Sequence, residues 1–141
     1  MDYEQRCQEI RKENEELLEL FAYDMRNLSP RTINRHVSNV DLYINDFLLY
    51  DDIRTFDQGI YEIGNFLGEF FIRKCMWSTP ATIKSTATSI KKFYKSMLDH
   101  KNIEKEDYDV LCCIIKENMD TWQSLCATYN DPDEENPFFF F

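Results

Sequence analysis

Two short stretches of the chain, LSPRTINRH and WSTPATIKS, share the signature of a helix start. In the first, Ser29 precedes Pro30, and in the second, Ser78 and Thr79 precede Pro80. A hydroxyl at the N-cap accepts a hydrogen bond from a backbone N–H of the first turn, and proline suits the first helical position because no N–H is needed there. We therefore expect one helix to begin at Pro30 and another to begin near Pro80.

Apolar residues recur at helical spacing in five segments of the chain, each bounded by loop residues or helix breakers. The chain has 141 residues but only three glycines and four prolines, so it is poor in turn residues and long enough to bury one core. We predict an all-α fold of about five helices, with one domain over residues 1–130 and a tail over 131–141. The predicted helices span residues 2–27, 30–49, 58–74, 80–100 and 104–129.

The apolar stripe of the fourth segment shows how the core is predicted. One face of this segment carries apolar residues at spacings of three and four, namely Ile83, Ala87, Ile90, Tyr94 and Met97. The third segment is less regular, because its three glycines, Gly59, Gly64 and Gly68, lower its helix propensity. The start of this third helix, near Gln58, is the least constrained of the predicted boundaries.

The cysteines and histidines predict no metal or disulfide framework. Five cysteines form no C-x-x-C pair and mostly lie among apolar neighbours, which favours reduced, buried thiols. The two histidines, His36 and His100, lack ligand spacing, so we expect neither a metal nor another cofactor. Because the first twenty residues carry charge throughout and no apolar run reaches the length of a membrane span, we expect a soluble, cytoplasmic protein without membrane contact.

Charge is segregated along the sequence. The formal net charge of −10 argues against a nucleic-acid partner, because phosphate neutralisation dominates affinity for DNA. Residues 78–105, however, contain six lysines and two acids, whereas residues 106–141 contain nine acids and one lysine. The distribution of charge, unlike its sum, leaves a phosphate-binding surface open.

Two predicted helices carry cations on their polar faces. At 100° per residue, Lys84, Thr88, Lys91 and Lys95 fall within an arc of about 60° on the fourth helix. The second helix adds cations and amides on its exposed side, with His36 nearer its buried edge. Ammonium, guanidinium and hydroxyl groups are the donors that phosphates need. The alternative reading is a solvated face that balances acidic neighbours.

At these positions the chain resembles a known module. The segment LSPRTINRHVSNVDLYINDFL resembles part of the opening helix pair in the SAM-like core-binding domain of tyrosine recombinases, the phage-integrase family. The segment STPATIKSTATSIKKFYKSMLDHKNIEKE resembles a later helix of that domain and the turn after it. The resemblance covers roughly residues 5–110 and implies an orthogonal helical bundle that clamps duplex DNA with two helices at the major groove.

The resemblance assigns those two helices to Arg31–Asn45 and Thr82–His100. The DNA-binding residues that it implies are Arg31, Thr32, Arg35, Lys84, Ser85, Thr88, Lys91, Lys92 and Lys95. It thus predicts a non-catalytic module that binds double-stranded DNA and acts as an accessory or regulator of DNA recombination or integration. The alternative is a protein–protein interaction module that kept the fold and lost DNA binding, since only two arginines lie on the candidate surface.

No catalytic arrangement is expected. Recombinase chemistry requires a second domain with an arginine cluster, a His-x-x-Arg pair and a tyrosine nucleophile, and neither His36 nor His100 begins such a pair. No glycine-rich phosphate loop, H-E-x-x-H or G-x-S-x-G motif occurs either. We therefore expect this chain to be no enzyme.

The tail DPDEENPFFFF combines four acids with four phenylalanines, Phe138, Phe139, Phe140 and Phe141. An acidic peptide ending in Pro-Phe resembles the C-terminal tip of bacterial single-stranded-DNA-binding proteins, which docks into basic pockets of partner enzymes. The tail could dock on a recombinase or another protein, on a dimer mate, or on the basic fourth helix of its own chain, where it would occlude DNA. Packing of the phenylalanines on their own bundle is the equally weighted alternative.

Overall fold

The computed structural model describes residues 2–138, and within this range the chain is all-α, with five helices packed together and no strand. Two of the five helices are composite, because α-helical turns continue into wider or tighter ones. The elements are α1 (Tyr3–Asp24), α2 (Pro30–Asp41) with η1 (Leu42–Phe47), η2 (Phe56–Ile60), α3 (Ile63–Asn65) with η3 (Phe66–Phe70) and α4 (Phe71–Lys74), then α5 (Pro80–Asp99) and α6 (Lys105–Asn130).

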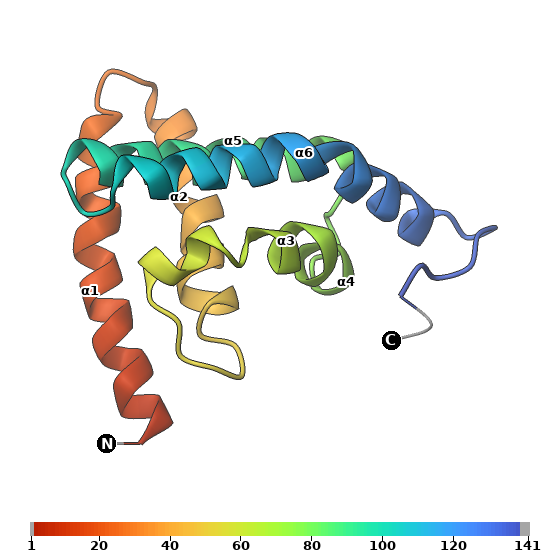
Figure 1. The fold of residues 1–141 in the computed structure, drawn as a ribbon, viewed down its shortest axis with the longest axis horizontal. Helices are drawn as coiled ribbons and strands as arrows, with labels where there is room; N and C mark the ends of the chain where they lie inside the picture. Colours follow the sequence, from red (N-terminus) through yellow and green to blue (C-terminus); the bar gives the residue numbers. More distant parts are fainter. Residues whose placement is uncertain (1, 139–141) are drawn as a thin grey trace.

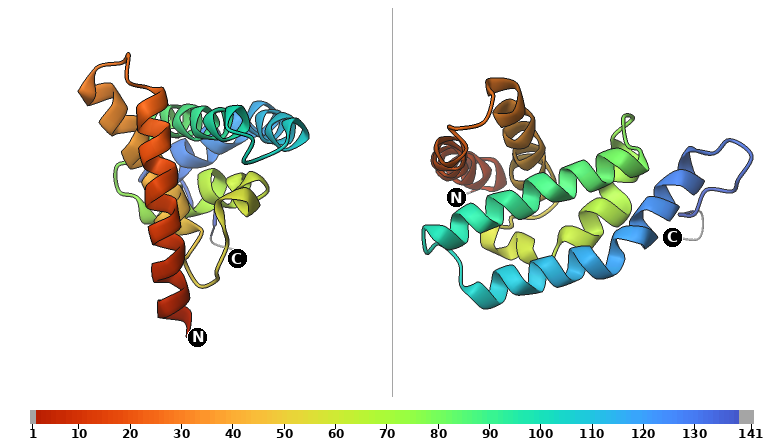
Figure 2. Two further views of the ribbon diagram at one scale, coloured as in Figure 1. Left: turned by 90° about the vertical axis from the view of Figure 1, so that its left-hand side faces the viewer. Right: turned by 90° about the horizontal axis from the view of Figure 1, so that it is seen from above.

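The two longest C-terminal helices, α5 and α6, lie side by side and antiparallel (Figures 1 and 2). Helix α1 runs across one end of this pair, and α2 packs against both α1 and α5 (Figure 2). The composite segment η2–α3–η3–α4 lies beneath the pair in the orientation of Figure 1 and contacts α6. Helices α2 and α5 therefore meet directly in the tertiary structure.

Both predicted helix starts are confirmed. The Ser29 hydroxyl accepts a hydrogen bond from the backbone N–H of Thr32, and Pro30 occupies the first turn of α2. Of the two cap candidates before Pro80, Thr79 is the cap, because its hydroxyl accepts from the N–H of Thr82. Hydroxyl caps and N-terminal prolines thus set where the two candidate DNA-binding helices begin.

The predicted start of the third helix was wrong by about five residues. Gln58 lies in the tight turn η2, and regular α-helix begins only at Ile63. The cause is tertiary: the carbonyl oxygens of Phe56 and Gly59 accept hydrogen bonds from the buried hydroxyls of Tyr94 and Tyr43. These two bonds hold η2 as a turn in the core.

The predicted apolar stripe of the fourth segment is confirmed as core. All five of its residues are at most 2% exposed, namely Ile83, Ala87, Ile90, Tyr94 and Met97. Aromatic rings fill the centre, with Phe93 of α5 edge-on to Phe21 of α1 at 5.5 Å between ring centroids. No helix in residues 2–138 is long and apolar enough to cross a membrane.

Gly59 leaves room for the two tyrosines, and this gives a stability prediction. A Cβ atom added there would overlap the Tyr94 hydroxyl and lie 3.0 Å from side-chain carbons of Leu48 and Tyr43. We expect Gly59→Ala to lower the free energy of unfolding by about 2–3 kcal/mol, because overpacking a closed core forces side chains from their preferred positions. Urea denaturation followed by circular dichroism measures this loss.

Gly64→Ala is the matched control for Gly59→Ala. A Cβ atom at Gly64 meets nothing within 4 Å, and alanine favours helix over glycine by up to about 1 kcal/mol. The control is therefore expected to be as stable as the wild type or more stable. Equal effects of the two substitutions would contradict the role given to Gly59.

Candidate nucleic-acid interface

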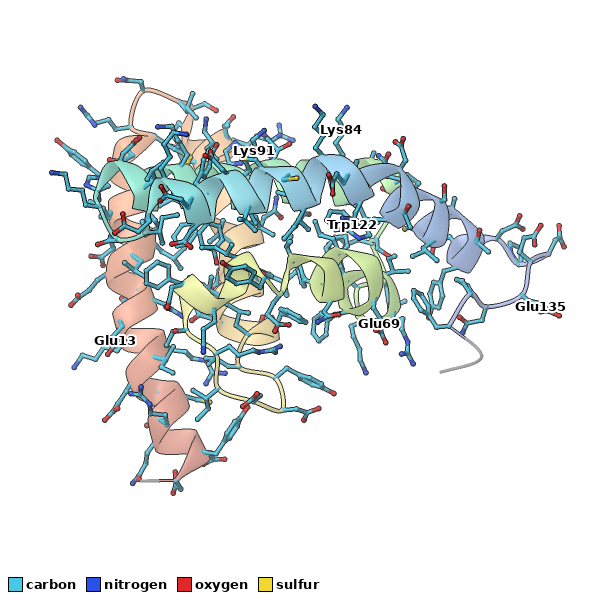
Figure 3. All side chains as sticks on the ribbon, in the orientation of Figure 1. Glu13, Glu69, Lys84, Lys91, Trp122 and Glu135 are labelled. Carbon is cyan, nitrogen blue, oxygen red and sulfur yellow. The ribbon has the colours of Figure 1, made fainter. Side chains whose placement is uncertain are left out.

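The structure places the nine predicted DNA-binding residues on two helices that touch. Arg31, Thr32 and Arg35 lie on the first two turns of α2, and the other six lie along α5. All the arginines and lysines among them are exposed, whereas Thr32 and Ser85 are half-buried. Figure 3 shows Lys84 and Lys91 projecting from the outer side of α5, away from the remainder of the bundle.

A buried polar contact joins α2 to α5 beneath these cations. The imidazole Nδ1 of His36 lies 2.8 Å from the Ser89 hydroxyl oxygen, which also accepts a hydrogen bond from the Asn39 side chain at 3.0 Å. His36 is 6% exposed and Ser89 is fully buried. Buried polar groups hold their neighbours in one arrangement because a lost partner is costly, so this contact fixes how α2 crosses α5.

One cation from each helix lies near His36. Burial lowers the pKa of His36, and the nearby charges of Arg35, from α2, and Lys92, from α5, lower it further. Both effects disfavour a charged imidazole, so His36 is neutral at neutral pH. Arg35 and Lys92 thus both lie near the ring where α2 meets α5. The exposed cations of these two touching helices are named here the cationic face: Arg31, Arg35, Lys84, Lys91, Lys92 and Lys95.

Most of the cationic face is free of acidic partners. Lys95 is the exception, because its ammonium nitrogen lies 2.6 Å from a carboxylate oxygen of Asp99. The remaining cations form no ion pair with any residue in the range 2–138: Arg31, Arg35, Lys84, Lys91 and Lys92. Since acids exceed bases by ten in the whole chain, five unpaired cations on two touching helices are a marked segregation of charge.

The hydroxyl groups near the cationic face are partly engaged in their own helices. Thr88 donates its hydroxyl proton to the carbonyl oxygen of Lys84 at 3.0 Å. Thr32 accepts a hydrogen bond from the Ser29 hydroxyl at 2.9 Å. The guanidinium and ammonium groups are consequently the donors that are free to bind an anionic ligand. Thr88 can donate to such a ligand only if its hydrogen bond to the Lys84 carbonyl oxygen breaks.

One cluster at the edge of the cationic face was not predicted from the sequence. An Asp24 carboxylate oxygen accepts hydrogen bonds from the Ser96 hydroxyl at 2.5 Å and from His100 Nε2 at 2.8 Å. Burial alone would raise the pKa of Asp24, but the bonds from Ser96 and His100 and the charges of His100 and Arg26 together lower it. Ser96 and His100 lie 72 and 76 positions from Asp24 in the sequence, so no local motif could reveal the cluster.

This cluster is not a nucleophilic triad. Ser96 donates to Asp24 rather than to His100, so the imidazole is not placed to take the hydroxyl proton as it would be in a triad. The cluster instead ties the C-terminal end of α1 to the C-terminal end of α5. It borders an open hollow of about 400 Å³ whose lining includes Arg26, Lys92 and Lys95.

The cysteines follow the prediction in part. Cys7, Cys75 and Cys126 are buried free thiols, but Cys113 is exposed and Cys112 is half-buried on α6. The expectation of burial was wrong for Cys113, because its position on α6 faces away from the core. Burial, assisted by the charge of Asp46, raises the pKa of Cys75 to about 11, so this thiol stays protonated. In the described part of the chain no three Cys, His, Asp or Glu side chains converge as metal ligands would.

The described part of the tail packs on its own bundle. Phe138 is 8% exposed and lies 5.9 Å from the Tyr129 ring, centroid to centroid. The guanidinium carbon of Arg73 lies 5.6 Å from the Phe138 ring centroid. The tail therefore turns back toward α4, and Figure 3 places Glu135 at the far end of the molecule from Lys91. Residues 131–138 do not cover the cationic face, and Phe139, Phe140 and Phe141 lie outside the described residues.

Comparisons with protein-family models, curated proteins and solved structures found no match. The resemblance of two segments to a recombinase domain therefore stays a prediction.

The low pKa of His36 predicts acid-sensitive stability. The unfolded chain binds a proton near pH 6.5, the ordinary value for histidine, whereas the folded chain binds it only at lower pH. Stability is therefore present above pH 6.5 and is lost as the pH falls through that value. We expect His36→Asn, which keeps a polar partner for Ser89, to lose less stability than wild type between pH 7.5 and pH 5.0.

Urea denaturation of both proteins at the two pH values measures this difference. Asp24 does not contribute to it, because its pKa is lowered from 3.8 and it titrates below this window. Equal losses of stability in wild type and His36→Asn would show that His36 is not buried between the two cations.

Packing of Phe138 gives a third stability prediction, at the opposite end of the molecule from Lys91 (Figure 3). We expect Phe138→Ala to lower the free energy of unfolding by about 1–2 kcal/mol, because the ring leaves the surface formed by Tyr129 and Arg73. Glu134→Gln, an exposed position in the same tail, is the matched control and should change little. Thermal unfolding of the three proteins checks this, and an unchanged Phe138→Ala variant would contradict the packing.

Proposed function

We propose that this chain is a non-catalytic DNA-binding module whose α2 and α5 together bind the phosphates of duplex DNA. The observation that supports it best is that exposed cations stand on two helices, α2 and α5, that the buried contact of His36 with Ser89 holds together. Five cations of this face have no acidic partner among the described residues. Unpaired guanidinium and ammonium groups on one surface are what phosphate binding needs.

The geometry of α5 suits a polyanion that extends along the helix. Lys84 and Lys91 are seven residues apart on the exposed side of α5, which corresponds to about 10 Å of helix rise. Duplex DNA carries one negative charge per about 1.7 Å of its axis, so several phosphates come within reach of this row. Most contacts would come from lysines, which bind phosphate with little sequence choice, and base readout would fall to Arg31 and Arg35.

The net charge of −10 does not prevent DNA binding on this proposal, but it restricts which side of the protein faces the DNA. Many of its acidic groups lie away from this face: Figure 3 shows Glu13, Glu69 and Glu135 on parts of the molecule remote from Lys84 and Lys91. Repulsion of these regions by DNA leaves the cationic face as the favoured side of approach. Binding should accordingly weaken steeply as salt screens the attraction.

The proposal includes a relation of this fold to the SAM-like core-binding domain of tyrosine recombinases. The five packed helices have the number and class expected of an orthogonal, SAM-like core-binding bundle, and α2 and α5 coincide with the two helices that the resemblance assigns to DNA. On this basis the module is an accessory or regulator of DNA recombination or integration. It supplies DNA affinity and no strand cleavage.

A protein-interaction module is the second candidate, favoured by an open hollow of about 420 Å³ between η3 and α6. Gly64 and Gly68 line one side of this hollow, and Trp122, Leu125 and Phe138 line the other. A glycine-lined hollow with aromatic walls can receive an apolar side chain of a partner. It lies on the side of the molecule that the cationic face does not occupy, so binding there would not require α2 or the outer side of α5.

DNA binding is tested by fluorescence anisotropy with a labelled 30-base-pair duplex at 50, 100 and 200 mM NaCl. With five phosphate contacts we expect log affinity against log salt to have a slope of about −4 to −5. Replacing Lys84 and Lys91 together by alanine should reduce the slope by about 2 and weaken binding at 50 mM salt.

The matched control replaces Lys12 on α1 and Lys116 on α6 by alanine. Both lysines are exposed and outside the cationic face, so the control loses the same charge and should keep the wild-type slope. Absence of wild-type binding at 50 mM salt would exclude the DNA-binding proposal and leave the interaction module. Equal effects of the two double variants would show attraction to net charge without a defined face.

A further inference from the structure

Two large apolar side chains, Met76 and Trp77, stand exposed in the connection between α4 and α5. Met76 is 100% exposed and Trp77 is 60% exposed, whereas the second tryptophan, Trp122, is only 4% exposed. A tryptophan contributes more apolar area to a core than almost any other residue when it is buried. Figure 2 shows this connection standing clear of the neighbouring helices at the N-terminal end of α5. Met76 and Trp77 are named here the tip.

The tip is held at both ends by buried neighbours. Cys75 before it and Ser78 after it are 4% and 3% exposed. The Ser78 hydroxyl donates to the carbonyl oxygen of Ile72 at 3.2 Å, and the Ser78 carbonyl accepts from the Asn130 side chain at 2.8 Å. These bonds tie the connection to α4 and to α6, so the exposure of the tip is a feature of the folded structure.

The Trp77 ring is also supported. It lies edge-on to Phe71, with 6.4 Å between ring centroids and an interplanar angle of 86°. The Trp77 carbonyl oxygen accepts a hydrogen bond from the Thr82 hydroxyl at 3.3 Å. One edge of the indole is thereby anchored while much of its surface stays in solvent. A supported ring loses little conformational entropy when it binds, which favours its use in recognition.

The tip lies at one end of the row of lysines on α5. Lys84 is four residues into the helix from Pro80, about 6 Å of helix rise, and its side chain projects from the outer side of α5 (Figure 3). A long ligand that lies along the lysines and extends past the start of α5 would pass near the connection that carries the tip (Figure 2). Such a ligand presents anionic groups to Lys84 and Lys91 and flat apolar faces to Trp77, a combination found in the phosphates and bases of nucleic acid.

We propose that the tip inserts against the bases of DNA bound on the cationic face. Trp77 stacks on a base that has left its neighbour, and Met76 fills the adjoining space, as apolar wedges do where proteins partly unstack a duplex. This inference rests on the proposed DNA-binding function. It adds a ligand preference: DNA with a weakly stacked position, such as a single unpaired base, binds more tightly than a fully paired duplex because less unstacking is required.

The first test uses the emission of the two tryptophans as its readout. A 30-base-pair duplex with one central unpaired base is titrated into wild type and into Trp77→Phe at 50 mM NaCl. Wild-type emission should be quenched as the indole stacks, whereas the remaining emission of Trp77→Phe, which comes from buried Trp122, should be unchanged.

The second test separates stacking from charge. Trp77→Ala should weaken binding of the bulged duplex about 5- to 100-fold, keep the wild-type salt slope, and bind bulged and paired duplexes equally. Lys84→Ala, in contrast, should reduce the slope by about 1 and keep the preference for the bulge. Met76→Ala, at a side chain with no contact to lose in the fold, should show a smaller loss of the same kind as Trp77→Ala.

The outcomes distinguish this inference from the function on which it rests. Wild-type binding with no quenching and with unchanged affinity of Trp77→Ala and Met76→Ala would overturn the inference and leave the DNA-binding module intact. No wild-type binding of either duplex would overturn both. If sedimentation velocity showed a dimer that Trp77→Ala dissociates while DNA affinity stays unchanged, the tip would be a protein contact and the inference would fail.

Discussion

Two buried tyrosine hydroxyls, one from η1 and one from α5, both bind the backbone of the turn η2. Tyr43 of η1 donates to the carbonyl oxygen of Gly59, and Tyr94 of α5 donates to that of Phe56. Burial raises the pKa of both tyrosines far above the ordinary value, so both stay uncharged donors. A buried hydroxyl without a partner costs about 1–3 kcal/mol, and the bonds therefore hold η1 and α5 to one turn. The absence of a side chain at Gly59 lets both rings approach.

The placement of α2 against α5 depends on this arrangement. Helix α2 continues into η1 without a break, so fixing Tyr43 fixes the C-terminal end of α2 as well. The contact of His36 with Ser89 then holds the middle of α2 to α5. Five exposed cations of these two touching helices have no acidic partner among the described residues, so repulsion between them is offset only in part. A chain with acids in excess could have paired these cations, and an anionic ligand would remove the repulsion.

Much of the fold and some of the site could be predicted from the sequence because these features are local. Caps such as Ser29 and the 3.6-residue period act over one or two turns, so the helices and the stripe around Tyr94 were confirmed. The start of the third helix could not be predicted, because contacts with tyrosines distant in sequence decide it. Two further features were missed for the same reason. The cluster of Asp24, Ser96 and His100 depends on contacts between residues distant in sequence, and the tip at Trp77 depends on its exposure in the folded chain. Helical periodicity encodes neither.

The sequence alone determined an all-α chain, because period, caps and scarcity of glycine and proline all favour helix at short range. It also determined that the polar faces of two of the helices carry cations, since their spacing follows from helical geometry. Tertiary structure decided that α2 meets α5 at the buried contact of His36 with Ser89, that Phe138 turns toward Arg73 and away from the lysines, and that Trp77 stays outside the core. Each of these outcomes depends on which distant side chains are buried together, and burial is a property of the packed bundle.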